Sequence, residues 1–566
     1  MNQNQKNILT LIGIGILFFF PFLGSVHLFD WDEINFAESA REMIETGNYF
    51  QVQINYEPFW EKPPFFFWMQ VISMKLFGIN EFAARFPNAL IGIISLITLY
   101  SIGKKLFSEK FGMIWALIYL ASFLPHLYFK SGIIDPIFNF FIFISVYYLA
   151  KNLSENTVKD KRKFALISGV FIGLAIITKG PVGLLLLILT LIVFLILKKF
   201  KVKMRVQDIL IFAISSFSVT FLWFGYETIT NSPWFIIEFI QYQIELFTEP
   251  VAGHEQPFYY HFLVVLLGCF PMSILALPMF KKLKENTPFD LILWMKILFW
   301  VVLILFTIVK TKIVHYSSMS YLPLSFMAAY FIFQLSEKKQ IISKSIKIIF
   351  LIIGLIFSTL LIITPILFSQ KELLSTLIKD DFAVASLNVD MDWQGWEFLI
   401  GIIYFVSVIF AFIYLNRGRL MKFVYFVAFS AGATLLLYSI FVVPKIEKFS
   451  QGPAIEFYES IEKEDAYITT LGFKSYAHLF YFKLKPDVES DGIATIKENY
   501  KKGLANSKDF NMNTLISKTN NWLLHGDIDK KAYFVTKITE RNNMKKYQNL
   551  TLLKTVGGFD FYYRKP

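Results

Sequence analysis

The sequence predicts a polytopic α-helical membrane protein that ends in a small soluble α/β domain. Three observations predict this class. The 566 residues are 55% hydrophobic and 18% aromatic, with a mean hydropathy of +0.51, as is typical of polytopic membrane proteins. Apolar windows long enough to cross a hydrocarbon core of about 30 Å recur along most of the chain. After Val443 the composition changes to charges, turn residues and moderate hydrophobicity.

The membrane part, residues 1–443, is predicted to contain about thirteen spans, since apolar windows of sufficient length alternate with polar loops. The first window has only Lys6 ahead of it and no small-residue cleavage site after it, so we expect a retained signal anchor. Residues 64–77 are apolar but too short to cross, and are expected to lie in the membrane interface. The predicted spans are 8–28, 84–103, 111–129, 136–151, 163–178, 182–198, 208–226, 259–279, 289–309, 317–335, 346–368, 396–415 and 421–443.

Lysine and arginine gather in alternate loops, which predicts the orientation of the chain. The positive-inside rule places those loops in the cytoplasm. The acidic first loop, the loop that holds Asp135 and the C-terminal tail then face outward. The net charge of +12 lies mainly in these short loops, which argues against a nucleic-acid partner. The single cysteine, Cys269, excludes an intrachain disulfide. The basic segments are 104–110, 159–163, 198–205, 281–284, 338–339 and 417–422.

The first outer loop, residues 29–64, is the strongest candidate for chemistry. Asp30, Asp32 and Glu33 directly follow the first apolar window, where burying an unpaired carboxylate costs several kcal/mol. These groups must therefore stay hydrated, pair with cations or react at the membrane surface. Residues 33–46 fit an amphipathic helix. In the alternative interpretation, Asp30 or Asp32 only caps this helix and Glu33 completes a capping box.

Two further charged positions lie at predicted outer ends of spans. Glu61-Lys62 precedes two prolines, and a lysine held there beside a glutamate is a candidate phosphate ligand; the alternative is a headgroup anchor that snorkels. Asp135, followed by proline, is either a helix N-cap or a second carboxylate that converges on Asp32. Lys179, in a tight turn between two spans, is compatible with a structural role.

Two later outer segments carry histidine and lysine. His254 stands in a polar turn before an aromatic belt, and a lone histidine there is usually structural or solvated. Lys312, His315 and Tyr316 form one short segment at the outer face. A lysine there opposes the positive-inside trend, and an anionic ligand such as a lipid phosphate would explain it.

Residues 444–566 are predicted to form the soluble α/β domain. The segments 466–471 and 532–535 have the pattern of strands, and 550–563 that of a hairpin that turns at two glycines. Residues 453–463 and 475–482 are predicted helices. We assign no motif to this region.

The charged motifs form an ordered set: Asp-Glu after the first span, Glu-Lys-Pro before the second, Asp at the end of the third, and Lys-x-x-His-Tyr late in the bundle. In this set the chain resembles the bacterial branch of the protein O-mannosyltransferase-like glycosyltransferases, which includes the aminoarabinose transferases of lipid A. The resemblance covers about residues 8–335. It implies a C-type glycosyltransferase core that uses a polyprenyl-phosphate sugar on the outer membrane face.

The resemblance also implies roles for individual residues. Asp32 matches the catalytic aspartate that orients or deprotonates the acceptor, with Glu33 as its companion and Asp135 as the second carboxylate of the site. The residues that match ligands of the donor phosphate are Lys62, Lys312 and Tyr316, and those assigned to other substrate contacts are Glu61, His254 and His315. Glu61 and His254 resemble a pair that holds a divalent ion in relatives. Asn35-Phe36 departs from the Arg-Tyr that aminoarabinose transferases often carry there.

The expected function is therefore a glycosyltransferase of the bacterial inner membrane, with its site and C-terminal domain in the periplasm. The expected acceptor is lipid A, another envelope glycolipid or a protein. A lipid-linked sugar flippase or transporter and an O-antigen-type ligase are the alternatives. A transporter would be expected to carry its ionisable residues near the bilayer midplane, whereas here they gather at the outer ends of spans.

Overall fold

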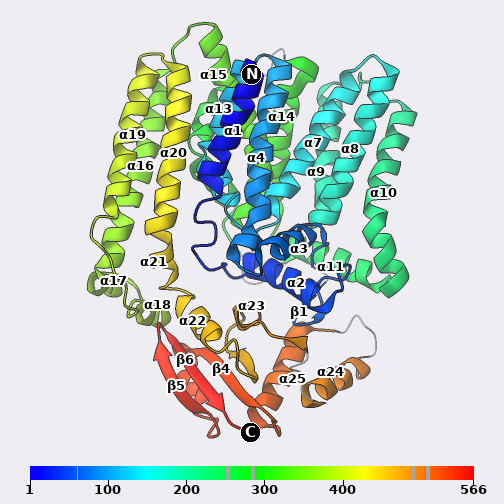
Figure 1. The fold of residues 1–566 in the computed structure, drawn as a ribbon. Helices are drawn as coiled ribbons and strands as arrows, with labels where there is room; N and C mark the ends of the chain where they lie inside the picture. Colours follow the sequence, from blue (N-terminus) through cyan, green and yellow to red (C-terminus); the bar gives the residue numbers. More distant parts are fainter. Residues whose placement is uncertain (60, 232, 250–254, 282–286, 487–490, 505–509) are drawn as a thin grey trace.

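The computed structural model describes residues 1–566 except 60, 232, 250–254, 282–286, 487–490 and 505–509. Long helices form a bundle, and the C-terminal strands lie beyond one end of it (Figure 1). The N-terminus is at the opposite end of the bundle. The helices of the first outer loop lie between the bundle and the C-terminal region. The first outer loop and the C-terminal region, which are the two most polar parts of the chain, therefore lie at the same end of the bundle.

The most apolar helices differ in how deeply they are buried. Helix α4 (Glu81–Leu106), helix α7 (Asp135–Ser154) and the span that contains α15 (Tyr321–Glu337) are 67%, 72% and 83% buried in their apolar windows. Helices α10 (Val206–Asn231) and α16 (Lys344–Ser369) are only 22% and 28% buried. Apolar side chains exposed over that length are expected to face lipid. The first group therefore forms the centre of the bundle and the second its periphery.

Each of the thirteen predicted spans overlaps a helix, but the count of thirteen spans is not confirmed. Eight helices in the described ranges are long and apolar enough to cross a membrane, or nine if a pair bent by 116° is one span. Helix α1 ends at Phe19, well before the predicted end at residue 28. It ends there because Pro21 follows, and proline is incompatible with a continuing helix. The other helices of the bundle are α5 (Glu109–Leu120), α8 (Val158–Lys179), α9 (Val182–Leu197), α14 (Leu291–Ile308), α19 (Phe398–Asn416), α20 (Leu420–Phe441) and the bent pair α12 (Tyr260–Gly268) and α13 (Met272–Lys281).

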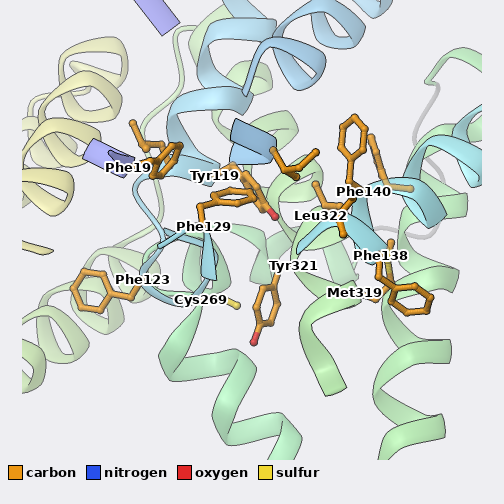
Figure 2. Close-up of a cluster of buried hydrophobic side chains, with 14 of the residues drawn as sticks. Phe19, Tyr119, Phe123, Phe129, Phe138, Phe140, Cys269, Met319, Tyr321 and Leu322 are labelled. Carbon is orange, nitrogen blue, oxygen red and sulfur yellow. The ribbon is translucent and has the colours of Figure 1, made fainter. Parts of the chain in front are cut away.

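Aromatic side chains hold the central helices together (Figure 2). The ring of Phe19 in α1 (Gln3–Phe19) lies edge-on to Phe129, with centroids 5.2 Å apart, and Tyr119 contacts the same ring at 5.9 Å. Such edge-to-face pairs each stabilise by about 1 kcal/mol beyond their burial. The indole of buried Trp115 donates to Ser325 Oγ at 2.9 Å. The closely packed bundle thus holds the polar groups at its end in fixed positions.

The first outer loop contains two helices and a short hairpin. Helix α2 (Asp32–Thr46) is present where a helix was predicted, but residues 33–43 are all buried, so it exposes no polar face over that length. It ends at Gly47 with φ +69°, the left-handed conformation expected of a glycine C-cap. The residue before α2, Trp31, makes no side-chain cap hydrogen bond, so the capping-box alternative is wrong. Strands β1 (Gln53–Ile54) and β2 (Glu57–Pro58) follow, then α3 (Phe65–Phe77).

The C-terminal region contains a four-stranded sheet in the order β3-β4-β6-β5. Strand β3 is parallel to β4, and the other neighbours are antiparallel. The predicted strands and the hairpin that turns at Gly557 and Gly558 are present; both glycines have positive φ. The strands are β3 (Ala466–Leu471), β4 (Lys531–Lys537), β5 (Thr551–Val556) and β6 (Phe559–Arg564), and the helices around them are α21 (Val443–Glu447), α22 (Gly452–Ser460), α23 (Ala477–Phe482), α24 (Asp491–Lys502), α25 (Met512–His525) and α26 (Arg541–Met544). Helices α24 and α25 were not predicted.

Candidate active site

Four ionisable side chains from four separate segments meet at the end of the bundle that faces the C-terminal region. His315 Nε2 lies 3.4 Å from Asp32 Oδ2 and 3.9 Å from Asp135 Oδ2. Lys179 Nζ donates to Asp135 Oδ1 at 2.6 Å. The Asp32 side chain is 37% exposed, whereas that of Asp135 is 5% exposed. Asp32 is therefore the carboxylate of this group that a substrate can reach.

The ends of helices position these four groups. Asp32 and Asp135 are the first residues of α2 and α7, where the positive end of the helix dipole stabilises a carboxylate. Asp135 is not the N-cap, since Ile134 occupies that position. Lys179 is the last residue of α8, which Gly180 terminates with φ +115°. A cation at a helix C-terminus is favoured for the same electrostatic reason.

Glu61 and Lys62 approach the group from the end of the first outer loop. Tyr242 in α11 (Trp234–Thr248) donates its hydroxyl to Glu61 Oε2 at 3.0 Å, and Lys62 Nζ lies 5.3 Å from the centre of the same tyrosine ring. Burial lowers the pKa of the Lys62 ammonium, and the nearby charges of Glu61 and Asp32 oppose that shift. The structure thus brings Lys62 into the electrostatic field of Asp32.

A narrow cavity of about 50 Å³ extends from this group into the bundle. Its polar end is formed by Lys62, Asp135, Lys179 and Tyr316. The remaining wall is mostly apolar and includes Phe138, Leu186, Leu246, Phe247, Phe306 and Val309. The ammonium of Lys179 lies 5.1 Å from the ring centre of Tyr316. A site with cations at one end and an apolar wall behind them suits a lipid phosphate.

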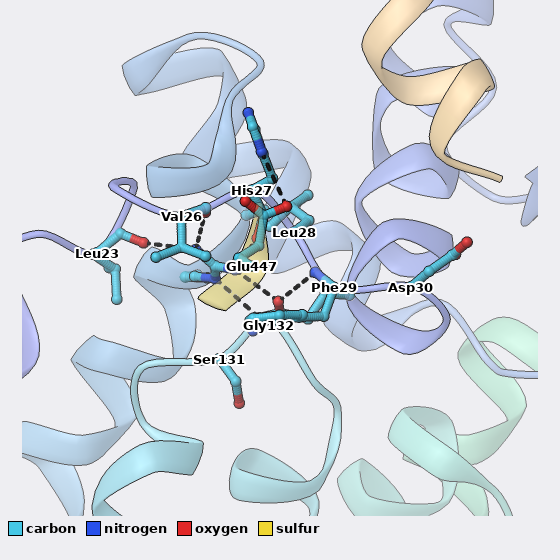
Figure 3. Close-up of polar contacts among 12 residues, drawn as sticks. Leu23, Val26, His27, Leu28, Phe29, Asp30, Ser131, Gly132 and Glu447 are labelled. Carbon is cyan, nitrogen blue, oxygen red and sulfur yellow. Dashed lines mark hydrogen bonds and ion pairs between the residues drawn. The ribbon is translucent and has the colours of Figure 1, made fainter. Parts of the chain in front are cut away.

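Glu33 does not line this cavity but accepts hydrogen bonds in a buried network; Figure 3 shows the backbone around this network, with Phe29 and Gly132 labelled. The Glu33 carboxylate accepts from Arg85 Nε at 3.0 Å and from Arg85 Nη2 at 2.8 Å, and the backbone N–H groups of Phe29 and Gly132 also donate to it. Arg85 donates in turn to the carbonyls of Leu23, Val26 and His27. Burial acts to raise the pKa of Glu33, but the charge of Arg85 outweighs it and the pKa lies below its usual value.

The remaining predicted residues are placed differently. Tyr316 borders the cavity, but Lys312, which is 8% exposed, is not among the described residues that line it. The segment of Lys312 is tied to the chain after α11, because Thr311 Oγ1 donates to the carbonyl of Glu249 at 2.8 Å. His254 lies outside the described residues, so the predicted metal pair with Glu61 is not defined by the structure. The described group with metal-ligand spacing is His27, Glu81 and Glu459, which does not contain Glu61.

Sequence reasoning missed three residues of the site. Lys179 was assigned no functional role, although a lysine on the predicted outer side opposes the positive-inside trend, as Lys312 does. Tyr242, in the middle of α11, and Arg85, near the start of α4, carried no signal, because isolated tyrosines and arginines are common near membrane–water interfaces. Only the folded structure identifies them, because it shows Tyr242 bound to Glu61 and Arg85 bound to Glu33.

Comparisons with known proteins agree with this fold. Residues 61–223 match the family described as dolichyl-phosphate-mannose-protein mannosyltransferase. The undecaprenyl phosphate-alpha-4-amino-4-deoxy-L-arabinose arabinosyl transferase of Wigglesworthia glossinidia brevipalpis is 28% identical over 62% of this chain and 63% of its own length. The enzyme of the same name from Shewanella sediminis is 25% identical over 66% of this chain and 68% of its own length. The chain thus matches less than two thirds of the first of these relatives.

Solved structures show the same architecture. ArnT from Cupriavidus metallidurans, bound to undecaprenyl phosphate, has a TM-score of 0.75 at 16% identity, over 98% of this chain and 97% of its own. The archaeal oligosaccharyltransferase AglB from Archaeoglobus fulgidus has a TM-score of 0.52 at 10% identity, over 96% of this chain and 70% of its own.

The fold is therefore shared with the solved structures of ArnT and AglB. The predicted resemblance to the protein O-mannosyltransferase-like family, and to its aminoarabinose transferase-like branch, is confirmed.

Proposed function

We propose that this protein is an integral-membrane glycosyltransferase that moves a sugar from a polyprenyl-phosphate carrier to an envelope acceptor. The main support is the placement of exposed Asp32 beside His315, with Lys62 and Lys179 at the polar end of an apolar-walled cavity. The names of the relatives, which refer to undecaprenyl phosphate, support the same class of donor. We extend the proposal to lipid A, another glycolipid or a protein as the acceptor.

In the proposed reaction, Asp32 accepts the proton of the acceptor hydroxyl, whose oxygen forms a bond to the anomeric carbon. The bond from that carbon to the carrier phosphate breaks, and the electron pair leaves with the phosphate oxygen. Lys62 and Lys179 stabilise the negative charge that develops there. A single displacement of this kind inverts the anomeric centre.

The other residues have supporting roles in this proposal. Asp135 accepts a hydrogen bond from Lys179 at 2.6 Å, which holds the ammonium beside the cavity. Tyr316 forms the wall beside it. His315 bridges the two carboxylates and Glu33 positions the loop through Arg85. Lys312 and His254 remain predicted substrate contacts, and residues 444–566 a predicted periplasmic domain.

The test is transfer of labelled sugar from an undecaprenyl-phosphate-linked donor in membranes that contain the full chain. We expect Asp32→Asn to abolish transfer, because the amide keeps the shape of the side chain but loses its basicity. The matched control is Asp381→Asn, an exposed aspartate at the start of α18 (Asp381–Ser386), which should transfer like wild type.

Full activity of Asp32→Asn would contradict the proposed mechanism. Movement of the lipid-linked sugar across the bilayer with no covalent product would instead favour the transporter. The mobility of a labelled product separates lipid from protein acceptors, and extension of a lipid-linked glycan chain would favour the ligase.

A further inference from the structure

A histidine and two glutamates meet where the C-terminal region contacts the membrane part. His27 lies in the segment between α1 and α2, Glu81 is the first residue of α4, and Glu459 lies in α22. One nitrogen or oxygen atom of each side chain lies within 4.8 Å of those of the other two. We call these three residues the His27 cluster. They are distant in sequence, so only the fold brings them together.

The atoms of the His27 cluster match the ligands that zinc takes in proteins. Zn²⁺ binds imidazole nitrogen and carboxylate oxygen at about 2.0–2.2 Å, and tetrahedral ligands at that distance are about 3.3–3.6 Å apart. Small rotations of the two glutamate side chains reach that spacing, since the last torsion of a glutamate is soft. Glu459 is exposed, so a water molecule has access to the fourth position. A mixed set of imidazole and carboxylate favours Zn²⁺ over Mg²⁺, which prefers oxygen ligands.

Glu447, at the end of α21, is a further observation that points to a metal ion. Its carboxylate Oε1 lies 3.2 Å from His27 Nδ1 (Figure 3), and its side chain is 3% exposed. A metal-binding histidine characteristically donates its other ring N–H to a carboxylate, which fixes the tautomer and makes the ligating nitrogen more basic. With the proton of the ring held on Nδ1 by Glu447, the lone pair of Nε2 is left for a metal ion.

The charges around His27 also favour a bound cation. In the part of the chain that the structure describes, no lysine or arginine forms an ion pair with the three glutamates near this histidine. Arg85 lies in the field of Glu81, but its guanidinium is bound to Glu33. Burial acts to lower the pKa of His27, but the contact with Glu447 and the nearby carboxylates outweigh it, and the pKa lies above its usual value. The local field therefore attracts positive charge.

The His27 cluster is connected to the first outer loop. The backbone carbonyl of His27 accepts from Arg85 Nη2 at 2.9 Å, and the same guanidinium holds Glu33, the neighbour of Asp32. Gln451, from the turn before α22, donates to the carbonyl of Leu28 at 2.7 Å. An ion at the cluster would thus fix the start of the loop relative to both α4 and α22.

We propose that His27, Glu81 and Glu459 bind one Zn²⁺ ion, with Glu447 as the carboxylate that orients the histidine. The ion has a structural role: it joins the C-terminal region to α4 and to the segment that leads into the first outer loop. This site does not contain Glu61, and it does not rest on the proposed function.

The direct test is equilibrium dialysis of the full chain in detergent against zinc chloride, after bound metal has been removed with a chelator. The ligand variant is Glu459→Gln, because an exposed side chain can lose its charge without disturbing the core. Its matched control is Glu456→Gln, an exposed position one turn earlier in α22. We expect Glu459→Gln to bind one Zn²⁺ ion fewer per chain than wild type or Glu456→Gln. This difference is independent of any ion bound elsewhere on the chain.

Three further measurements separate a metal site from a simple ion pair. Glu447→Gln should weaken zinc binding by about 10–100-fold, because it acts on the metal through His27. Zinc should raise the unfolding midpoint of wild type but not that of Glu459→Gln, since an ion that binds only the folded state stabilises it. Magnesium chloride should bind at least about tenfold more weakly than zinc chloride.

Each opposite result overturns part of the proposal. Equal zinc stoichiometry in wild type and Glu459→Gln would overturn the site, and so would absence of zinc binding to wild type. Unchanged affinity in Glu447→Gln would overturn the orienting role of that carboxylate, and equal binding of magnesium would overturn the assignment of zinc. Asp32→Asn should bind zinc like wild type while it transfers no sugar, so failure of this inference is distinguishable from failure of the proposed function.

Discussion

The most informative perturbation is Glu33→Gln, because it separates a catalytic from a positioning role. Sequence patterns grouped Glu33 with Asp32 as a reactive carboxylate. In the structure its two oxygens accept from Arg85 and from the backbone of Phe29 and Gly132, and both side chains of the ion pair are 5% exposed. We therefore expect the substitution to act on stability first and on activity only through the loop.

The magnitude follows from the burial of the pair. Removing one partner of a buried ion pair leaves the other charge uncompensated and typically costs about 3–5 kcal/mol. Arg85 keeps three carbonyl acceptors, so we expect the lower end, about 3 kcal/mol. An exposed pair provides the control: Glu337 and Lys110 are 2.9 Å apart with side chains 54% and 36% exposed. Glu337→Gln should cost less than about 1 kcal/mol.

The assay is a double-mutant cycle of equilibrium unfolding in detergent, with transfer activity measured on the folded fraction. Glu33→Gln combined with Arg85→Gln should regain part of the loss, because the double variant leaves no uncompensated charge, and the coupling should exceed about 1 kcal/mol. The reasoning is refuted if Glu33→Gln unfolds like wild type but transfers sugar more than about a hundredfold slower, since that separation identifies a group acting in the reaction itself.

Three further predictions address the site and its surroundings. Lys179→Met should lower the transfer rate by about a hundredfold, because it removes a charge-assisted donor from the proposed leaving group, and leaves Asp135 buried without its cation. Burial raises the pKa of Asp30 from 3.8 to about 6. The folded protein therefore binds a proton at Asp30 more tightly than the unfolded chain does. The free energy of unfolding should fall by up to about 3 kcal/mol as the pH rises from 4 to 6. Asp30→Asn should remove that dependence. Gly180→Ala should destabilise by about 1–3 kcal/mol, since φ is +115° and a Cβ would lie 2.6 Å from Phe239.

Each of these has a control and a contradicting result. For Lys179→Met the control is Lys344→Met at the exposed start of α16, and equal transfer by both variants would exclude a role in the reaction. Unfolding midpoints between pH 4 and 7 that are parallel for wild type and Asp30→Asn would show that Asp30 does not titrate as described. For Gly180→Ala, the comparison is Gly13→Ala, whose Cβ meets no atom within 4 Å; an equal effect would contradict the strain argument.

Much of the fold was predictable, because membrane insertion depends on local composition. Continuous apolar windows predicted the helices of the bundle, and Gly47 and the two glycines at 557–558 predicted where elements end. The number of spans was not predictable to the same degree. Helices such as α5 and α9, with 12 and 16 residues, are embedded in the bundle at lengths for which hydropathy does not distinguish a span from a buried core helix.

The sequence by itself determined the chemical types at the site: a carboxylate after the first span, a lysine before the second and a His-Tyr pair late in the bundle. Only the tertiary structure decided how they combine. Asp32 and Glu33 are adjacent in sequence, yet one is exposed beside His315 and the other is buried on Arg85. The physical reason is that consecutive residues of a helix point about 100° apart, so their partners come from distant segments that only the packed bundle brings near.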